Sequence, residues 1–126
     1  MTVYLTFEQV CAIHVAVRPS APILDAGIIQ SAVGRPQATA FGEDAYPTDW
    51  EKAAALMQSL ACNHGWEDDS KRTAWVAAMT FLDVNGHPLD PDFDQEAAEE
   101  FVLAVAEGRY RLVPKIASEL VKFTQH

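Results

Sequence analysis

A short polar segment brings together most of the residues that could do chemistry in this sequence. Residues 64–72, HGWEDDSKR, hold an imidazole, three carboxylates, a hydroxyl and two cations. A histidine suits proton transfer because its pKa lies near neutral pH. A lysine and an arginine bind phosphate oxygens as a point charge and as a planar fork. His64 with Lys71 and Arg72 therefore favours chemistry on a substrate that carries phosphate.

Apolar residues before this segment predict a helix that would hold its first half. The helix is expected to begin at a capping box formed by Thr48 and Glu51. His64 continues its apolar stripe, and Gly65 is expected to stop it. The stripe consists of Ala53, Leu56, Met57 and Leu60, which recur with helical spacing.

A second helix is expected to hold the other half of the segment. Asp68 or Asp69 could cap it, and the Asn-Gly pair at 85–86 would end it. It is apolar nearly all round, which predicts a buried, central position. Lys71 and Arg72 stand in its first turn, where the helix dipole already places about half a positive charge. An anion would relieve that repulsion, although the two cations could instead pair with the neighbouring acids.

The N-terminal third predicts two shorter helices. A capping box of Thr6 and Gln9 opens the first, which carries His14 on its apolar face. A hydrogen-bonded core histidine is favoured there over a metal ligand, because no second histidine or cysteine is near it in sequence. Asp25 is expected to cap the second helix, which ends at Gly34.

The remaining segments complete a single domain. Residues 35–47 have no helical period and contain two prolines and a glycine, which predicts an exposed loop or hairpin. Asp94 is expected to cap a helix that Gly108 ends, and the acids of 90–107 are expected to form its solvated face. A last helix covers 113–123. Five or six helices with one irregular segment predict one all-α domain over residues 1–126.

Composition excludes several classes of protein. The chain has 126 residues, 49% of them hydrophobic, and a net charge of −9. A general nucleic-acid binder needs a basic face, so none is expected. No apolar run approaches the ~20 residues that span a bilayer, and no secretion signal is evident, so we expect a cytoplasmic protein without a membrane partner. Cys11 and Cys62 fit no metal or disulfide pattern and are expected to be small buried residues.

Residues 64–74, HGWEDDSKRTA, resemble the core motif of the Fic superfamily. The resemblance is strongest to the death-on-curing (Doc) type, whose pattern is H-x-F-x-D-x-N-K-R-T-A. The commoner Fic form ends in G-N-G-R, and Lys71 stands where that form has its second glycine. The similarity extends to residues 24–27, 34–37, 42–48 and 81–86. It implies a Fic/Doc-like helical domain around a central buried helix, with a short flap or hairpin.

The resemblance assigns roles to the polar segment. His64 would be the general base that removes the proton of a target hydroxyl. Asp68 would hold Mg²⁺, which keeps several waters and needs few protein ligands. Ser70, Lys71 and Arg72 would bind the phosphates of ATP. Ser70 departs from the pattern, because the family has asparagine there and a serine hydroxyl has fewer hydrogen-bonding groups and a shorter reach.

The resemblance also implies a docking segment for the target. In Fic-type proteins a flap receives an extended target segment by strand pairing. The matching positions are Gln37, Ala38, Thr39, Ala40 and Phe41. The plain alternative for these residues is an ordinary surface loop.

The function that follows from the resemblance is that of a toxin kinase. Doc-type proteins, with a lysine at the position of Lys71, transfer the γ-phosphate of ATP to a threonine of elongation factor Tu and stop translation. A separate antitoxin of the prevents-host-death kind is implied, because the self-inhibitory signature of other relatives is not evident here. Two alternatives stay open: an AMP transferase, and a weak or silent Fic-like binding module, for which the departure at Ser70 is the main argument.

Overall fold

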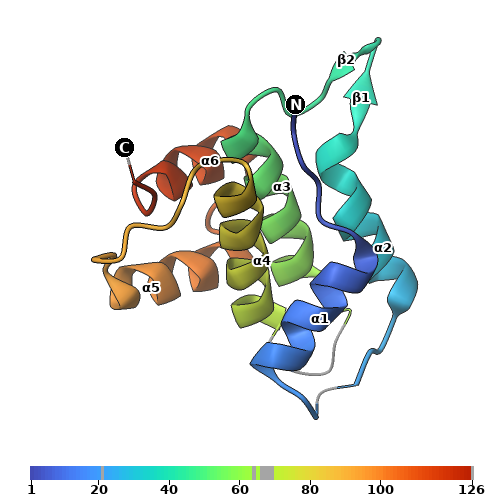
Figure 1. Cartoon of the computed structure of the whole chain (residues 1–126), viewed down its shortest axis with the longest axis vertical. Coiled ribbons are helices and arrows are strands. Elements are labelled where there is room, and N and C mark those ends of the chain that lie inside the picture. The colour runs from blue at the N-terminus through green and yellow to red at the C-terminus, as the bar shows by residue number, and fades with distance from the viewer. Residues whose placement is uncertain (21, 64, 66–69, 126) are drawn as a thin grey trace.

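Six α-helices and one small hairpin make up the part of the chain that the computed structural model describes, which is residues 1–20, 22–63, 65 and 70–125 (Figure 1). The helices are α1 (Phe7–Val17), α2 (Ala26–Gly34), α3 (Asp49–Cys62), α4 (Ser70–Val84), α5 (Gln95–Ala106) and α6 (Val113–Val121). Between α2 and α3 lie a 3₁₀ turn, η1 (Arg35–Gln37), and the strands β1 (Thr39–Ala40) and β2 (Glu43–Asp44). The expected all-α domain with a hairpin is confirmed.

Most helix starts follow the predicted caps. Thr6 and Gln9 form the full capping box of α1. Asp25 and Asp94 accept backbone N–H bonds at the starts of α2 and α5. Thr48 accepts the N–H of Glu51, but the return bond of a capping box is replaced by one from the Thr48 hydroxyl to the Glu51 carboxylate. At the other ends, the glycines at 86 and 108 have φ of +90° and +78°, conformations that favour glycine.

The central buried helix is α3. Nine of its 14 residues are buried, and it packs against α2, α4, α5, α6 and η1. We expected the following helix, α4, to take this place. That helix is also largely buried, but it contacts fewer elements, and its residues Trp75 and Val76 are only half-buried. The predicted stripes of α3, α5 and α6 all enter the core.

The predicted end of α3 is wrong by two residues. The helix ends at Cys62, and Asn63 leaves it in an extended conformation with φ −103° and ψ 118°. The N–H of Gly65 bonds to the carbonyl of Asn63, and its carbonyl accepts the N–H groups of Leu24 and Asp25. Gly65 therefore ties the chain to the start of α2 and does not act as a helix stop.

Two further expectations need correction, on the exposure of the hairpin segment and on the cysteines. Residues 35–47 form the predicted hairpin, but Pro36 is buried and Arg35 half-buried because η1 packs against α3. Within the predicted docking segment, Thr39 and Ala40 form β1 and Gln37 ends η1, and the docking role itself stays a prediction. Cys11 and Cys62, expected to be buried, are both half-buried and free. Within the described residues no helix is long and apolar enough to cross a membrane.

Candidate active site

The first turn of α4 carries the predicted phosphate-binding residues. Ser70 is buried, whereas Lys71 and Arg72 point to the exposed surface. Among the described residues, neither Lys71 nor Arg72 has a carboxylate within ion-pair distance. The ion pairs found there join other side chains. The neighbouring acids at 67–69 lie outside the described residues. The geometry leaves two cations beside a helix N-terminus, which is an arrangement suited to an anion.

A pocket of about 500 Å³ adjoins these cations. Lys71, Arg72 and Trp75 line it from α4, and the segment from Phe93 to α5 forms its other wall. The rings of Trp75 and Phe93 lie 5.9 Å apart at an interplanar angle of 31° and make part of the surface apolar. A charged rim next to an aromatic wall suits a ligand that has both phosphates and a flat apolar group.

The sequence did not reveal this pocket. The available signal was the spacing of Trp75, three residues after Arg72 and hence on the same side of α4. The opposite wall could not be found in this way, because Phe93 and Glu99 belong to a later segment that only the tertiary fold brings to α4.

Two predicted site residues, His64 and Asp68, lie outside the described residues. The residues on either side of His64 are described. Asn63 caps α3, and Gly65 is buried and hydrogen-bonded to the backbone at the start of α2. The chain on both sides of the predicted base is therefore held by α2 and α3.

Gly65 packs closely against α2. A Cβ atom built at this position would lie 2.5 Å from Cγ1 of Ile29 and 3.2 Å from its Cδ1. Ile29 itself is only 1% exposed and cannot swing into solvent. The space beside the predicted base thus admits a glycine and no larger residue without movement of α2.

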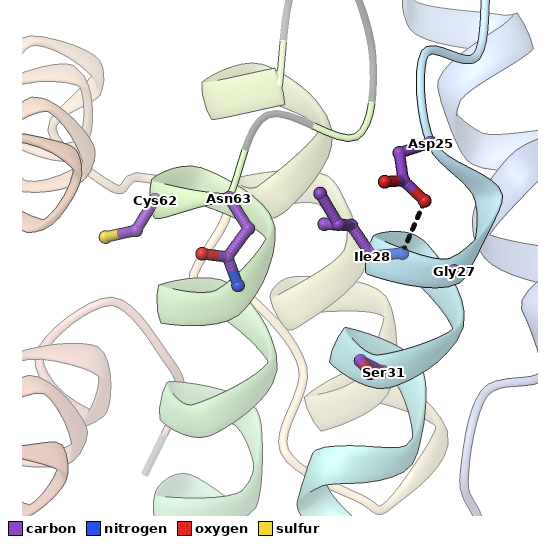
Figure 2. A pocket seen from close by; sticks show the side chains of 6 residues that line it. All are labelled: Asp25, Gly27, Ile28, Ser31, Cys62 and Asn63. Atoms are coloured by element: carbon purple, nitrogen blue, oxygen red, sulfur yellow. Dashed lines mark hydrogen bonds between the residues drawn. The ribbon is translucent and has the colours of Figure 1, made fainter.

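A second hollow lies between the start of α2 and the end of α3 (Figure 2). It has a volume of about 690 Å³ and is lined by Asp25, Gly27, Ile28, Ser31, Cys62 and Asn63. The Asp25 carboxylate is occupied in capping α2, where it accepts the N–H of Ile28 at 3.2 Å. Burial raises the pKa of the Cys62 thiol, an effect that nearby Arg35 partly opposes. The thiol is therefore protonated at neutral pH, and nothing here resembles an activated nucleophile.

His14 holds α1 against the first turn of α4. It is 2% exposed, and its Nδ1 lies 2.7 Å from Oγ1 of the fully buried Thr73. Thr73 directly follows Arg72 in the sequence. The prediction of a hydrogen-bonded core histidine is confirmed, and the bond fixes the turn that presents the two cations.

The predicted flap lies away from these cations. Figure 1 shows the hairpin at one end of α3 and the start of α4 at the other end. Lys71 and Arg72 are the second and third residues of α4. A helix of 14 residues is about 20 Å long, so about one helix length separates the two features. The hairpin has both central residues, Phe41 and Gly42, at positive φ, as the tight type I′ hairpin turn requires.

The described residues contain no group of three His, Cys, Asp or Glu side chains that could hold a metal ion. The predicted metal ligand, Asp68, and the acids on either side of it lie outside those residues. Mg²⁺ retains several waters and needs few protein ligands.

Comparison with known proteins points to one family. The model of the Fic/DOC family matches residues 4–82, which include α1 to α3 and most of α4. The chain is also 49% identical over 124 residues to Toxin Doc of Mycolicibacterium smegmatis. That match covers 98% of this chain and 95% of the relative.

Proposed function

The chain belongs to the Fic/DOC family, and we therefore propose that it is a Doc-type toxin that transfers the γ-phosphate of ATP to a protein hydroxyl. By the family resemblance, that hydroxyl belongs to a threonine of elongation factor Tu. The observation that carries the proposal is the first turn of α4, where Lys71 and Arg72 lack ion-pair partners among the described residues and border a pocket.

Phosphoryl transfer depends mainly on positioning and on neutralising negative oxygens. In our proposal Lys71 and Arg72, with the Ser70 hydroxyl and the first-turn N–H groups of α4, bind the phosphates. The target oxygen forms a bond to the γ-phosphorus while the bond to the β,γ-bridging oxygen breaks, and ADP leaves. The proton of the target hydroxyl passes to His64 as general base.

Asp68 is the residue that would hold Mg²⁺ in this scheme. The bound ion supplies positive charge to phosphate oxygens. The chain's own residues supply the rest: the cations orient the triphosphate, and the backbone bonds of Gly65 hold the residue that follows His64 in sequence against the start of α2.

Lys71 supports transfer of the γ-phosphate over transfer of AMP. Its long cationic side chain lines the pocket beside Arg72, where AMP-transferring relatives have a glycine. An ammonium group there fills space that a glycine leaves open and attracts the terminal, most highly charged phosphate. For that reason we propose that ATP binds in the orientation opposite to the one it takes in AMP-transferring relatives.

Target docking is assigned to the flap segment Gln37–Phe41 in this proposal. The reacting hydroxyl would lie about one length of α3 away from the docked strand. An extended segment covers that ~20 Å in about six residues. The protein would act in the cytoplasm and be silenced by an antitoxin of the prevents-host-death kind, whose disordered tail folds on binding.

The test is transfer from labelled nucleotide. The protein is incubated with elongation factor Tu, Mg²⁺ and ATP labelled at either the γ- or the α-phosphate. We expect label on the target only from γ-labelled ATP. Label from α-labelled ATP alone would establish the AMP transferase, and no label from either would favour the binding module.

Growth on induction separates catalysis from binding. His64→Ala and Arg72→Ala are expected to abolish toxicity, because each removes a group that acts on the reacting phosphate. The matched control is Arg109→Ala, since Arg109 is an exposed arginine whose contacts are surface ion pairs with Glu100 and Glu107. Equal toxicity in all three variants would refute the proposal that toxicity depends on catalysis.

A further inference from the structure

We propose that Lys52 and Arg35 are positioning residues that hold the hairpin as a rigid docking edge for the target protein. This inference rests on the proposed function, in which the target binds the hairpin. It adds that two cations at the base of the hairpin fix this edge, and that apolar packing does not. These cations set the affinity for the target and take no part in phosphoryl transfer.

Apolar burial does not fix the hairpin. All of residues 37–45 are exposed, including the Phe41 side chain at its tip. The two strands pair over only two residues each, Thr39 with Asp44 and Ala40 with Glu43. An isolated hairpin of this size is marginal in water, so its orientation must come from contacts at its base.

Lys52 holds the second strand from beneath. Its side chain is 2% exposed, and its Nζ lies 3.1 Å from Oδ2 of Asp44 in β2. The same ammonium also donates to the backbone carbonyl of Tyr46. A lysine is rarely buried, and the first turn of α3 is an unfavourable place for a cation because of the helix dipole. The bonds to Asp44 and Tyr46 offset both the burial of the ammonium group and its repulsion by the helix dipole.

Arg35 holds the entry to the hairpin. Its guanidinium donates to the Tyr46 hydroxyl at 3.0 Å and also lies over the tyrosine ring, 5.4 Å from its centroid. The same group donates to three acceptors of α3: the Ala55 carbonyl at 3.2 Å, the Gln58 side chain at 2.8 Å and the Ser59 hydroxyl at 3.0 Å. This set joins η1, the segment after β2 and the middle of α3.

Both cations therefore converge on Tyr46, one on its carbonyl and the other on its ring and hydroxyl. The entry and the exit of the hairpin are tied to the same helix. A β1 edge fixed in this way offers its backbone groups to a partner strand without first having to be ordered, which favours binding.

The experiment compares Lys52→Met with Asp44→Ala. Methionine keeps an unbranched chain in the buried space, and Asp44→Ala breaks the same ion pair from an exposed position, without altering α3. Lys115→Met is the matched control, because Lys115 is an exposed lysine whose ion pair with Glu119 lies within α6. Tyr46→Phe tests the Arg35 side by removing a single hydroxyl acceptor.

Three quantities are measured for each variant: hydrogen exchange of the hairpin amides, steady-state kinetics with purified elongation factor Tu, and ATP hydrolysis without target. We expect faster exchange over residues 38–45 in Lys52→Met and Asp44→Ala, with exchange in α4 unchanged. The KM for the target should rise about tenfold, as expected for the loss of one charge-assisted hydrogen bond. The kcat and the ATP hydrolysis rate should change less than about twofold, and Tyr46→Phe should give a smaller rise in KM.

Faster hairpin exchange with an unchanged KM would overturn the inference and leave the proposed function intact. A parallel loss of ATP hydrolysis and thermal stability would also overturn it, because that pattern shows a general structural role. A wild-type protein that transfers no phosphate would refute the proposed function itself, and with it this inference.

Discussion

Replacing Gly65 with alanine tests the arrangement on which the candidate site depends. The added methyl would lie 2.5 Å from Cγ1 of Ile29, a distance that real Cβ atoms essentially never show. Ile29 is buried, so the methyl cannot be accommodated by a rotation into water. Either α2 or the chain at position 65 must move, and movement at 65 strains the bonds from the N–H groups of Leu24 and Asp25 to the Gly65 carbonyl.

The expected cost follows from overpacking of a close-packed interior. Inserting one methyl group into such a site costs about 1–3 kcal/mol in free energy of unfolding. For a domain of 126 residues, each kcal/mol lowers Tm by roughly 3–5 °C. We therefore expect Gly65→Ala to lower Tm by about 3–15 °C. Toxicity should fall further than stability alone explains, because His64 is adjacent in sequence.

The assay is urea or thermal unfolding of Gly65→Ala beside a matched glycine variant, Gly34→Ala. Gly34 is helical, and a Cβ there would meet nothing within 4 Å. Alanine at that position should raise stability by about 0.4–1 kcal/mol, because it restricts the unfolded chain and favours helix. A double variant with Ile29→Ala removes both clashing atoms and should cost less than the sum of the two single changes.

A Gly65→Ala protein as stable as wild type, or one that behaves like Gly34→Ala, would refute the reasoning. Strict additivity with Ile29→Ala would do the same, since it would show that the two positions do not compete for space.

Three further predictions can be checked on the same protein. Thr73→Val should lower the free energy of unfolding by about 1–3 kcal/mol, because it removes the buried hydrogen bond between Thr73 and His14, and urea titration measures this. Phe41→Gly should leave stability unchanged or raise it by up to about 1 kcal/mol, because φ at this position is +55°, while transfer to the target falls if the hairpin tip contacts it. Burial alone raises the pKa of the Glu119 carboxyl, but hydrogen bonds from two neighbouring lysines bring the pKa below its ordinary value. The stabilisation is therefore present above the ordinary pKa of glutamate and lost as pH falls below it, and Glu119→Gln should flatten the decline of Tm with acid.

The local elements of this fold were predictable because their signals are local. The capping residues Thr6, Asp25 and Asp94 act within three residues of themselves, so the sequence alone locates those helix starts. The inward stripes follow from helical periodicity in the same way, and all of their members lie in the core or at its edge. The motif at 64–74 identified the family before any coordinates were needed, because its residue types and order are specific.

The ends of elements and the surroundings of the site depended on tertiary contacts. After α3 ends at Cys62, the Gly65 carbonyl accepts bonds from the N–H groups of Leu24 and Asp25, some 40 residues earlier. Helical periodicity contains no signal for such bonds. The glycine was predicted as a helix stop, whereas the structure uses its small size for close packing against Ile29.

What the sequence alone determined is the set of reactive groups and the helices that carry them, since types, caps and periodicity are encoded within a few residues. Only the tertiary structure decided how these groups are surrounded. It places Phe93 and α5 opposite Lys71 and Arg72, separates the hairpin from these cations by the length of α3, and buries Lys52 beside β2. The physical reason is that burial and distance arise from packing between segments far apart in the chain, and no local pattern of residues records which segments will meet.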